Sequence, residues 1–559
     1  MMLKDIAHLP HNIQRVVEIL RTLWRHGLGH VVTRLNVQEY MPLVGRMVTR
    51  KVEMLPPDDE TIARRLALVM QELGPTFIKL GQILSTRPDF VPEPYISEFR
   101  KLQAAVAPFP TPEAKEIIER ELGRPIARMF SEFSDQPLAS GSIAQVYSAR
   151  LADGTAVVVK VRRPGIDKKI RSDIDILRFL ARHAERNWPS LGPTRIVDEF
   201  DSAIRKELDL VVEASCTSKF RKLLPQMPGI RCPEVFWDYS TANVLTMERL
   251  HGIRPDDVDE LDRRGVDRKA LAHTLGQAFI KQYIEFGFFH ADPHPGNMVI
   301  DSDGNAVLLD FGMMGHLSDE LLGQLTTALV AISTQNLDVL VEVFMEMGQA
   351  PVSDPRQMTS DLMEMLDKYY GMPLKRIDAR AVLNDAFRIA RNHGLVLPRD
   401  LVMLMRSLVL ITSIARTLDP DFNIAEVIEP EARRLMMQKL SPHRAAKAAG
   451  VHLWHIARLV QTLPRQLKAI LQKIESGTLA VAFKHQGLES LIMQIDRASN
   501  RLSVSIILGA TLVGSSIALQ ARILPLPVIG VSAIGFVGYM IAALLGLWLV
   551  WDILRSGRF

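Results

Sequence analysis

The chain has 559 residues, of which 47% are hydrophobic and 23% are charged, and its formal net charge is +4. A chain of this length exceeds one typical domain, and its composition excludes a disordered protein. The small net charge excludes a uniformly basic nucleic-acid-binding protein, and two cysteines, Cys216 and Cys232, cannot form a disulfide framework for a chain this long.

The N-terminal part predicts helices rather than a secretory signal. Residues 1–30 read as an amphipathic helix with scattered charges, and they lack an unbroken apolar segment followed by a cleavage site of small residues. We therefore expect the body of the protein to lie in the cytoplasm. Farther along, the segment Leu73–Asp89 predicts a helix that ends near Pro88, and by pattern alone Lys79 is an ordinary surface lysine on it.

Residues 137–162 predict a strand, a turn of small residues and a second strand that ends in Val-Val-Val-Lys160. In kinases, a glycine-rich hairpin of pattern GxGxxGxV covers the ATP phosphates, and a lysine on a following strand pairs with them. Here Ala139 and Ala144 stand at the outer glycine positions, around a central Gly141. An ordinary hairpin with no ligand is the alternative interpretation.

A lysine in this role needs a carboxylate partner. The segment 206–214 predicts a helix that offers Glu207 and Glu213, about two turns apart, and either could pair with Lys160. The segment Thr246–Arg249 follows a short apolar strand and fits the hinge at which kinases hydrogen-bond adenine.

Two further motifs follow in the order of a kinase catalytic centre. The segment from His290 to Asn297 matches HxDxxxxN, in which Asp292 would orient or deprotonate the attacking group and Asn297 would hold a metal ion. The apolar run before Asp310 predicts a strand that ends in Asp-Phe-Gly, which presents a carboxylate to Mg²⁺. Together these motifs predict Mg²⁺-dependent handling of ATP.

A basic segment precedes the C-terminus. Arg433–Lys473 contains nine lysines and arginines, no acidic residue, and apolar residues at helical spacing. This pattern favours binding to anionic membrane lipids, and a solvated helical face is the alternative.

The C-terminus predicts a transmembrane hairpin. Val504–Ala521 and Ile523–Trp551 contain no charged residue, and each is long enough to cross a hydrocarbon core of ~30 Å. The turn between them contains Arg522, and basic residues flank both outer ends, which places these ends in the cytoplasm. A buried helical pair in a soluble domain is the alternative. Small residues recur at every fourth position of both spans, which suits packing within the hairpin or dimerisation.

These motifs resemble the UbiB, or aarF-domain, family of atypical kinases, and the resemblance covers most of the chain. The most specific sign is Lys79-Leu-Gly-Gln82, which is similar to the family's KxGQ motif in an N-terminal extension that folds across the active site. The resemblance implies that Glu207 and Asp209 form the ExD pair near the metal, together with Asn297 and Asp310.

The resemblance also implies the remaining roles. The catalytic set is Asp292, Lys160, Glu213, Lys79 and Gln82, with Glu213 as the better partner for Lys160. The set that binds ATP comprises the alanine-rich loop with the lysine and the hinge: Leu138, Ala139, Ser140, Gly141, Ser142, Ile143, Ala144, Gln145, Val146, Lys160 and Glu248.

The family implies ATP binding, slow hydrolysis and support of the biosynthesis of a lipid quinone, usually ubiquinone, at the bacterial inner membrane. Partners would be lipid quinone precursors, anionic lipids, other quinone-biosynthesis proteins and a second copy through the membrane helices, with no nucleic acid. No Ala-Pro-Glu follows Gly312, so phosphorylation of other proteins is not expected. A small-molecule or lipid phosphotransferase, and a non-catalytic scaffold gated by nucleotide, are the alternatives.

The expected architecture is α+β, a two-lobed kinase-like fold. We expect a helical extension over 1–120, an N-lobe over 121–250, a helical C-lobe over 251–430, basic amphipathic helices over 431–500 and a transmembrane hairpin over 501–559.

Overall fold

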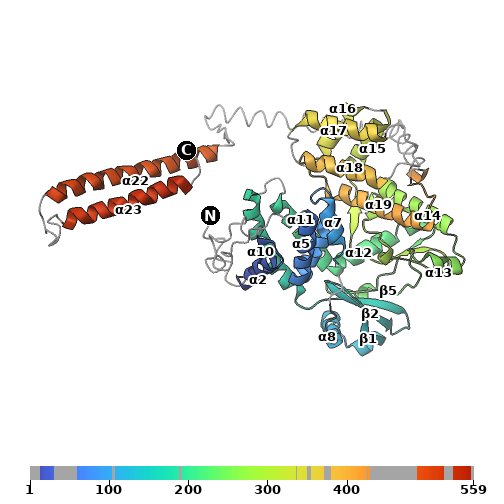
Figure 1. Ribbon diagram of the computed structural model, residues 1–559. Coiled ribbons are helices and arrows are strands. Elements are labelled where there is room, and N and C mark those ends of the chain that lie inside the picture. Colours follow the sequence, from blue (N-terminus) through green and yellow to red (C-terminus); the bar gives the residue numbers. More distant parts are fainter. Residues whose placement is uncertain are drawn as a thin grey trace, which may run out of the picture. The chain divides into compact units, whose positions relative to one another are not determined.

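The computed structural model divides into two units, residues 1–445 and 446–559 (Figure 1). The residues that the structure describes are 13–29, 59–102, 107–187, 192–334, 336–348, 354–369, 379–424, 426–428, 488–520 and 533–555. The basic segment 433–473 lies outside the described residues.

The N-terminal helices share a hydrophobic core with two helices from later in the chain. This layer contains α2 (Ile13–Arg25), α5 (Asp59–Leu73), α6 (Pro75–Leu84), α7 (Glu93–Arg100), α10 (Ile166–Asn187) and α11 (Pro193–Leu208). Phe77 of α6, Ile170 of α10 and Phe200 of α11 are all buried in it. The extension therefore packs against a segment, 166–208, that the sequence assigned to the N-lobe.

Two glycines fix the position of α6. Gly74 precedes the helix with φ +93°, which favours glycine, and Pro75 occupies the first helical position. At Gly81 an added Cβ would overlap Leu102 Cδ1 and lie 2.7 Å from Met70 Sδ, so a larger residue would have to displace these two buried side chains. The helix that carries Lys79 is thereby held tightly against its neighbours.

A four-stranded antiparallel sheet follows. The elements are α8 (Thr111–Leu122), α9 (Ile126–Met129), β1 (Phe130–Ser140), β2 (Ala144–Leu151), β3 (Ala156–Arg162) and β5 (Val244–Glu248), and the strand order is β1-β2-β3-β5. Val157, Val159 and Val161 of β3 are buried on the face that shares a core with α8. Because side chains alternate along a strand, Lys160 points to the opposite face.

Two small sheets carry the catalytic motifs. In one, β7 (Met298–Ile300) and β8 (Ala306–Leu308) are antiparallel, and β4 (Ile230–Arg231) joins β8 in parallel. In the other, β6 (Phe288–His290) pairs with β9 (Met314–His316). Along the chain, the segment between β3 and β7 also contains α12 (Leu210–Arg221), η3 (Leu224–Gln226), η4 (Trp237–Tyr239) and η6 (Pro295–Asn297). The strand pairs bring the segments around Asp292 and Asp310 together.

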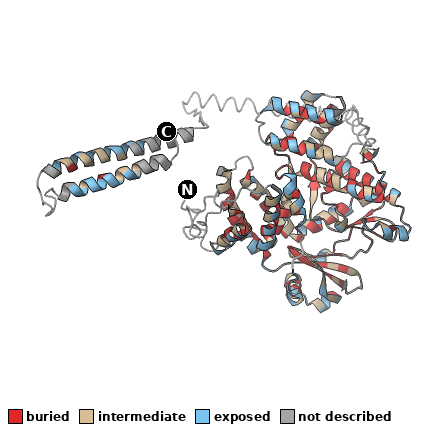
Figure 2. Cartoon of the chain, viewed as in Figure 1, coloured by how far each residue is buried: buried red, intermediate tan, exposed pale blue. Residues whose placement is uncertain are grey.

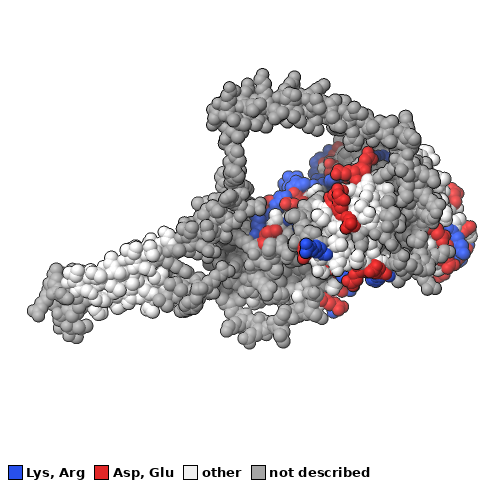
Figure 3. All heavy atoms as spheres, turned by 90° about the horizontal axis from the view of Figure 1, so that it is seen from above, with Lys and Arg blue, Asp and Glu red and all other residues white. Residues whose placement is uncertain are grey.

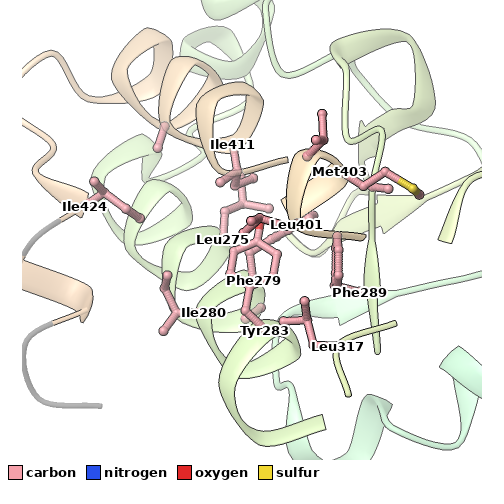
Figure 4. Close-up of a cluster of buried hydrophobic side chains, with 14 of the residues drawn as sticks. Leu275, Phe279, Ile280, Tyr283, Phe289, Leu317, Leu401, Met403, Ile411 and Ile424 are labelled. Carbon is pink, nitrogen blue, oxygen red and sulfur yellow. The ribbon is translucent and has the colours of Figure 1, made fainter. Parts of the chain in front are cut away.

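The largest hydrophobic core lies mainly among the helices of residues 258–418. They are α13 (Val258–Arg263), α14 (Arg268–Lys281), the π-helix η5 (Gln282–Phe286), α15 (Asp319–Thr334), α16 (Leu337–Met347), α17 (Pro355–Tyr369), α18 (Ala379–Asn392) and α19 (Arg399–Leu418). Leu275 and Phe279 of α14 face Ile411 of α19 in the middle of this core (Figure 4). A sheet-containing lobe followed by a helical lobe is the α+β kinase-like arrangement that the sequence predicts.

Among the described residues, α19 alone is long and apolar enough by composition to cross a membrane. Half of its apolar stretch is buried within the first unit, and Ile411 and Ala415 are completely buried. Its apolar character therefore reflects a position in a protein core.

The second unit contains α22 (Leu488–Gln520) and α23 (Ala533–Arg555), which pack against each other and have shorter apolar stretches, Leu502–Ala518 and Phe536–Leu547. Their described side chains are mostly exposed, in contrast to the buried helices of the first unit (Figure 2). Large apolar side chains such as Ile517 and Leu547 are 66% and 70% exposed, and the visible face of the pair carries no charged side chain between its grey ends (Figure 3).

Small residues make the contact between these two helices. Gly538 of α23 lies directly against Ser515 of α22, and Ala542 is buried one turn later. By contrast, a Cβ added at Gly514 would meet no atom within 4 Å. The small residues of α23 therefore serve packing within the hairpin, and the stripe that contains Gly514 faces away from it.

Candidate active site

Lys160 and Glu213 form the ion pair expected at the centre of the site. Lys160 Nζ, on β3, lies 2.9 and 2.7 Å from the two carboxylate oxygens of Glu213, on α12. Asp310 Oδ2 is 3.9 Å from the same ammonium group. Glu213 is 6% exposed, so its charge is compensated inside the protein mainly by Lys160.

The charges of this cluster depend on one another. Burial by itself would lower the pKa of Lys160, but the carboxylates of Glu213, Asp310 and Glu207 outweigh it and raise this pKa. Burial raises the pKa of Glu213 above its ordinary value, although Lys160 opposes the shift. Burial also acts to raise the pKa of Asp310, but Lys160 and the Gly312 N–H lower it overall, so Asp310 remains a carboxylate.

Asp310 is held by its own turn. Its Oδ1 accepts a hydrogen bond of 2.8 Å from the backbone N–H of Gly312. The next residue, Phe311, is 1% exposed, and its ring centroid lies 5.1 Å from that of Phe220 on α12. The helix that carries Glu213 and the segment that carries Asp310 are thus packed together through these two rings.

The loop with Asp292 is anchored by His290. The imidazole Nε2 donates to the Asp310 carbonyl oxygen at 2.6 Å, and Nδ1 accepts from the Asp292 N–H at 3.2 Å. This pattern needs a neutral ring, and burial lowers the pKa of His290 accordingly. Asn297 donates through Nδ2 to the Asp292 backbone carbonyl oxygen at 3.3 Å. The backbone carbonyl oxygen of Asn297 accepts from the Leu309 N–H at 2.9 Å. Asn297 and Asp310, two of the four candidate metal-binding residues, therefore lie on adjoining segments.

Sequence reasoning missed Arg406. Its Nη2 donates to Asp292 Oδ1 at 2.8 Å from α19, which lies 114 residues farther along the chain. The neighbouring Ser407 donates through Oγ to the His290 carbonyl oxygen at 2.6 Å. The one available signal was an arginine in the middle of a helix whose other charged residues lie in its first and last turns, since such a charge needs a partner. Helix α19 therefore holds the loop of Asp292 at two points.

Lys79 lies beside the same cluster. Its ammonium forms an ion pair with Glu207 of α11, and both side chains are largely covered. The charge of Lys79 also contributes to the lowered pKa of Asp310.

Gln82, in contrast, donates to the Leu102 carbonyl oxygen at 2.9 Å and so fastens α6 to the following segment. Asp209 accepts from the Val211 N–H at 3.0 Å and caps the N-terminus of α12.

The loop between β1 and β2 is fixed by an arginine. Arg163 donates through Nε to the Gly141 carbonyl oxygen at 2.9 Å and through Nη2 to Ser140 Oγ at 2.7 Å. Ile143 is buried in the core shared with α6, and Ser142 is buried with it, whereas Leu138 is 52% exposed.

The strand after this loop and the end of β5 hold two more of the predicted ATP-binding residues. Gln145 is completely buried, and its amide bonds to the backbone of Phe109 and to the Tyr147 hydroxyl. Glu248, at the end of β5, accepts from the Glu234 N–H at 3.2 Å and faces Arg231 at 3.8 Å. Both side chains are engaged by the protein, and Gln145 is buried as a whole residue, so its amide serves to hold the strand in place. Val146 lies on β2 opposite Lys160, between the buried residues Gln145 and Tyr147.

Among the described residues, no group of three or more His, Cys, Asp or Glu side chains is placed to hold a metal ion. Asp310 and Asn297 still fit Mg²⁺, which in nucleotide sites takes one or two protein oxygens and completes its shell with phosphate and water. The ionised carboxylate of Asp310, 44% exposed, offers such an oxygen.

Comparisons with known proteins show which family this chain resembles. Three family descriptions match: the ABC1 atypical kinase-like domain over residues 101–344, the UbiB helical domain over 362–423 and the ABC1/UbiB kinase-like C-terminal domain over 486–555. The chain is 34% identical to a probable protein kinase UbiB of Xylella fastidiosa, over 90% of this chain and 93% of that protein. It is 31% identical to an uncharacterized protein in the hydrogenase 1 5′ region of Clostridium pasteurianum, over 98% and 100%. A solved Mycobacterium tuberculosis protein in complex with erythromycin is 25% identical, with a TM-score of 0.45, over 66% of this chain and 95% of that chain.

Proposed function

Because the chain belongs to the ABC1/UbiB family of atypical kinase-like proteins, we propose that it is a membrane-bound kinase or ATPase that uses Mg·ATP in ubiquinone biosynthesis. The observation that carries this proposal is the Lys160–Glu213 ion pair with Asp310 only 3.9 Å from the ammonium group. A lysine fixed in this way is what kinases use to bind ATP phosphates.

Each residue of the cluster has a task in this reaction. Lys160, oriented by Glu213, binds the α- and β-phosphates, and Asp310 with Asn297 would hold Mg²⁺. A bound Mg²⁺ would neutralise charge on the β- and γ-phosphates. Asp292 accepts a proton from the attacking water or hydroxyl group as the bond between the β-phosphate oxygen and the γ-phosphorus breaks, and ADP leaves.

Two neighbours of the cluster control its geometry. Arg406 fixes the orientation of the Asp292 carboxylate, to which it donates at 2.8 Å. Lys79 and Glu207 close the site from the side of the N-terminal helices, where an ordinary protein kinase would bind its peptide. This cover supports release of phosphate or transfer to a small acceptor rather than phosphorylation of other proteins.

The substrate class and location follow from the family and from the C-terminal helices. We propose that lipid quinone precursors are acted on or extracted at the bacterial inner membrane, with the first unit in the cytoplasm. The exposed apolar faces of α22 and α23 support this location, because large apolar patches are unfavourable in water. Anionic lipid would be bound by residues 433–473, and other quinone-biosynthesis proteins and a second copy are further proposed partners.

The test combines nucleotide assays with lipid profiling. We expect the wild-type protein to release phosphate from Mg·ATP, Asp310→Asn to lose Mg²⁺-dependent ATP binding, and Asp292→Asn to bind ATP with at least a hundredfold lower turnover. A deletion strain that carries Asp292→Asn should accumulate polyprenylated quinone precursors, whereas wild-type protein should clear them. Unchanged Mg·ATP affinity in Asp310→Asn would contradict the assignment of the site. A normal quinone profile in the deletion strain would contradict the pathway.

A further inference from the structure

The helical lobe contains a cavity of about 320 Å³ that the catalytic cluster does not use. Its wall is formed by α14, η5 and α15 to α19, together with Leu317, Leu397 and Ile428. The volume lies at the lower end of the about 300–1,000 Å³ that is typical of ligand pockets. The cavity is partly open, and a concave apolar wall in contact with water is unfavourable, so its chemistry favours an apolar occupant.

The lining of this cavity is almost entirely hydrocarbon. Its described lining residues include no charged side chain, and their two hydroxyl groups are already engaged: the Tyr283 hydroxyl lies 2.8 Å from Ser407 Oγ, and Thr326 donates to the Leu322 carbonyl oxygen at 2.7 Å. Water needs several polar partners, so it gains little here, whereas apolar molecules do enter such cavities. Among its lining residues are methionines, including Met365 and Met405, whose flexible side chains adapt to ligands of irregular shape.

One wall of the cavity is the helix that holds the catalytic loop. Leu404, Met405 and Leu408 of α19 line the cavity, and between them stand Arg406 and Ser407, which bond to Asp292 and to the His290 backbone. Tyr283, shown in Figure 4 beside Leu317, lines the cavity and lies within hydrogen-bond distance of Ser407. Any occupant that shifts α19 therefore changes the position of the Asp292 carboxylate.

We propose that this cavity binds the aliphatic tail of a membrane lipid and that binding of the tail changes the rate of ATP turnover through α19. The effect on ATP turnover rests on the proposed function, whereas binding of the tail does not. The lining excludes a charged headgroup, so the lipid enters tail first, and the apolar helices α22 and α23 would give the protein access to lipid. The tail can be the polyprenyl chain of a quinone precursor or the acyl chain of a phospholipid.

The test is direct binding of chain probes to the full-length protein in detergent. Radiolabelled farnesol represents a polyprenyl tail and dodecanol an acyl tail. We expect saturable binding of one equivalent, and the tighter probe identifies the source. Ala386→Phe places a ring in the cavity from α18, and we expect at least a tenfold loss of affinity. Asn384→Phe adds the same ring at an exposed position of that helix and should bind like wild type.

Ala328→Phe fills the cavity from α15 and replaces Ala386→Phe should that variant not fold. Saturating probe should change phosphate release several-fold in wild type and in Asn384→Phe, and leave the filled variants unchanged. Absence of saturable binding to the wild-type protein would overturn the proposal. So would equal binding by wild type and a filled variant. Mg·ATP affinity is measured separately, so a protein that binds the probes but not ATP would refute only the proposed function.

Discussion

A buried ion pair beside the N-terminal helices gives the sharpest prediction. Arg87 donates to both carboxylate oxygens of Asp89, at 2.9 and 2.6 Å, and its Nη1 lies 2.9 Å from Glu199 of α11. The side chains of Arg87 and Asp89 are 4% and 0% exposed. Arg391 of α18 donates to the carbonyl oxygen of the intervening Pro88. This short segment therefore clamps α6 and α7 onto the rest of the first unit.

We predict that Asp89→Asn weakens this clamp by about 3 kcal/mol. Removal of one partner from a buried pair costs about 3–5 kcal/mol, and we take the lower end because Glu199 still faces Arg87. Since each 1.4 kcal/mol is a factor of ten, local opening should become on the order of a hundredfold more frequent. Amides of residues 75–91 should exchange with deuterium faster by that factor, as measured by mass spectrometry.

The control is Asp135→Asn. Asp135 pairs with Lys115 at 2.7 Å, but it is 83% exposed, and exposed pairs contribute about 0–1 kcal/mol. Exchange in 75–91 should therefore match wild type in this variant. Two results would contradict this prediction. One is amide exchange in residues 75–91 that is no faster in Asp89→Asn than in Asp135→Asn. The other is an equal increase of amide exchange in α14, because a clamp acts locally.

Three other predictions concern the site and the core. Lys79→Ala removes the cation paired with Glu207 beside the proposed phosphate site, so the affinity for Mg·ATP should fall several-fold in a fluorescence titration. Lys79→Arg should retain the wild-type affinity. Equal affinity in all three proteins would argue against a role of Lys79 at the site. Gly81→Ala overpacks the contact between α6 and its neighbours and should cost about 1–3 kcal/mol in denaturant unfolding, whereas Gly323→Ala, which has open space, should cost nothing. Burial raises the pKa of Cys232 to about 12, so its thiol is protonated at pH 8 and should resist alkylation in the folded protein. The thiol should become reactive only as the pH approaches 12 or when the protein unfolds. Rapid labelling of Cys232 at pH 8, mapped by peptide mass, would contradict this prediction.

The elements whose chemistry is local could be predicted from the sequence. Asp292 and Asn297 lie five residues apart on one loop, and the Asp310 carboxylate accepts from the N–H of Gly312 two residues on, so spacing singled out all three as candidates. Their catalytic and metal-binding roles stay predictions. The run of valines before Lys160 likewise predicted its strand, whereas the structure shows which valines are buried and that Lys160 lies on the opposite face. The uncharged C-terminal stretches predicted two helices, which the structure contains as α22 and α23.

Contacts between residues far apart in the sequence became visible in the folded protein. The partner of Asp292 is Arg406, from a helix 114 residues away, and no periodicity in either segment identifies that contact. Gln145 belonged by pattern to the loop over ATP, yet its amide is used to bind the backbone of Phe109. Spacing along a chain reports neighbours within a turn or a strand, whereas an ion pair or a cavity depends on how helices far apart in sequence pack. The cavity beside α19 is the clearest case, because seven helices and three separate residues must assemble before its apolar wall exists.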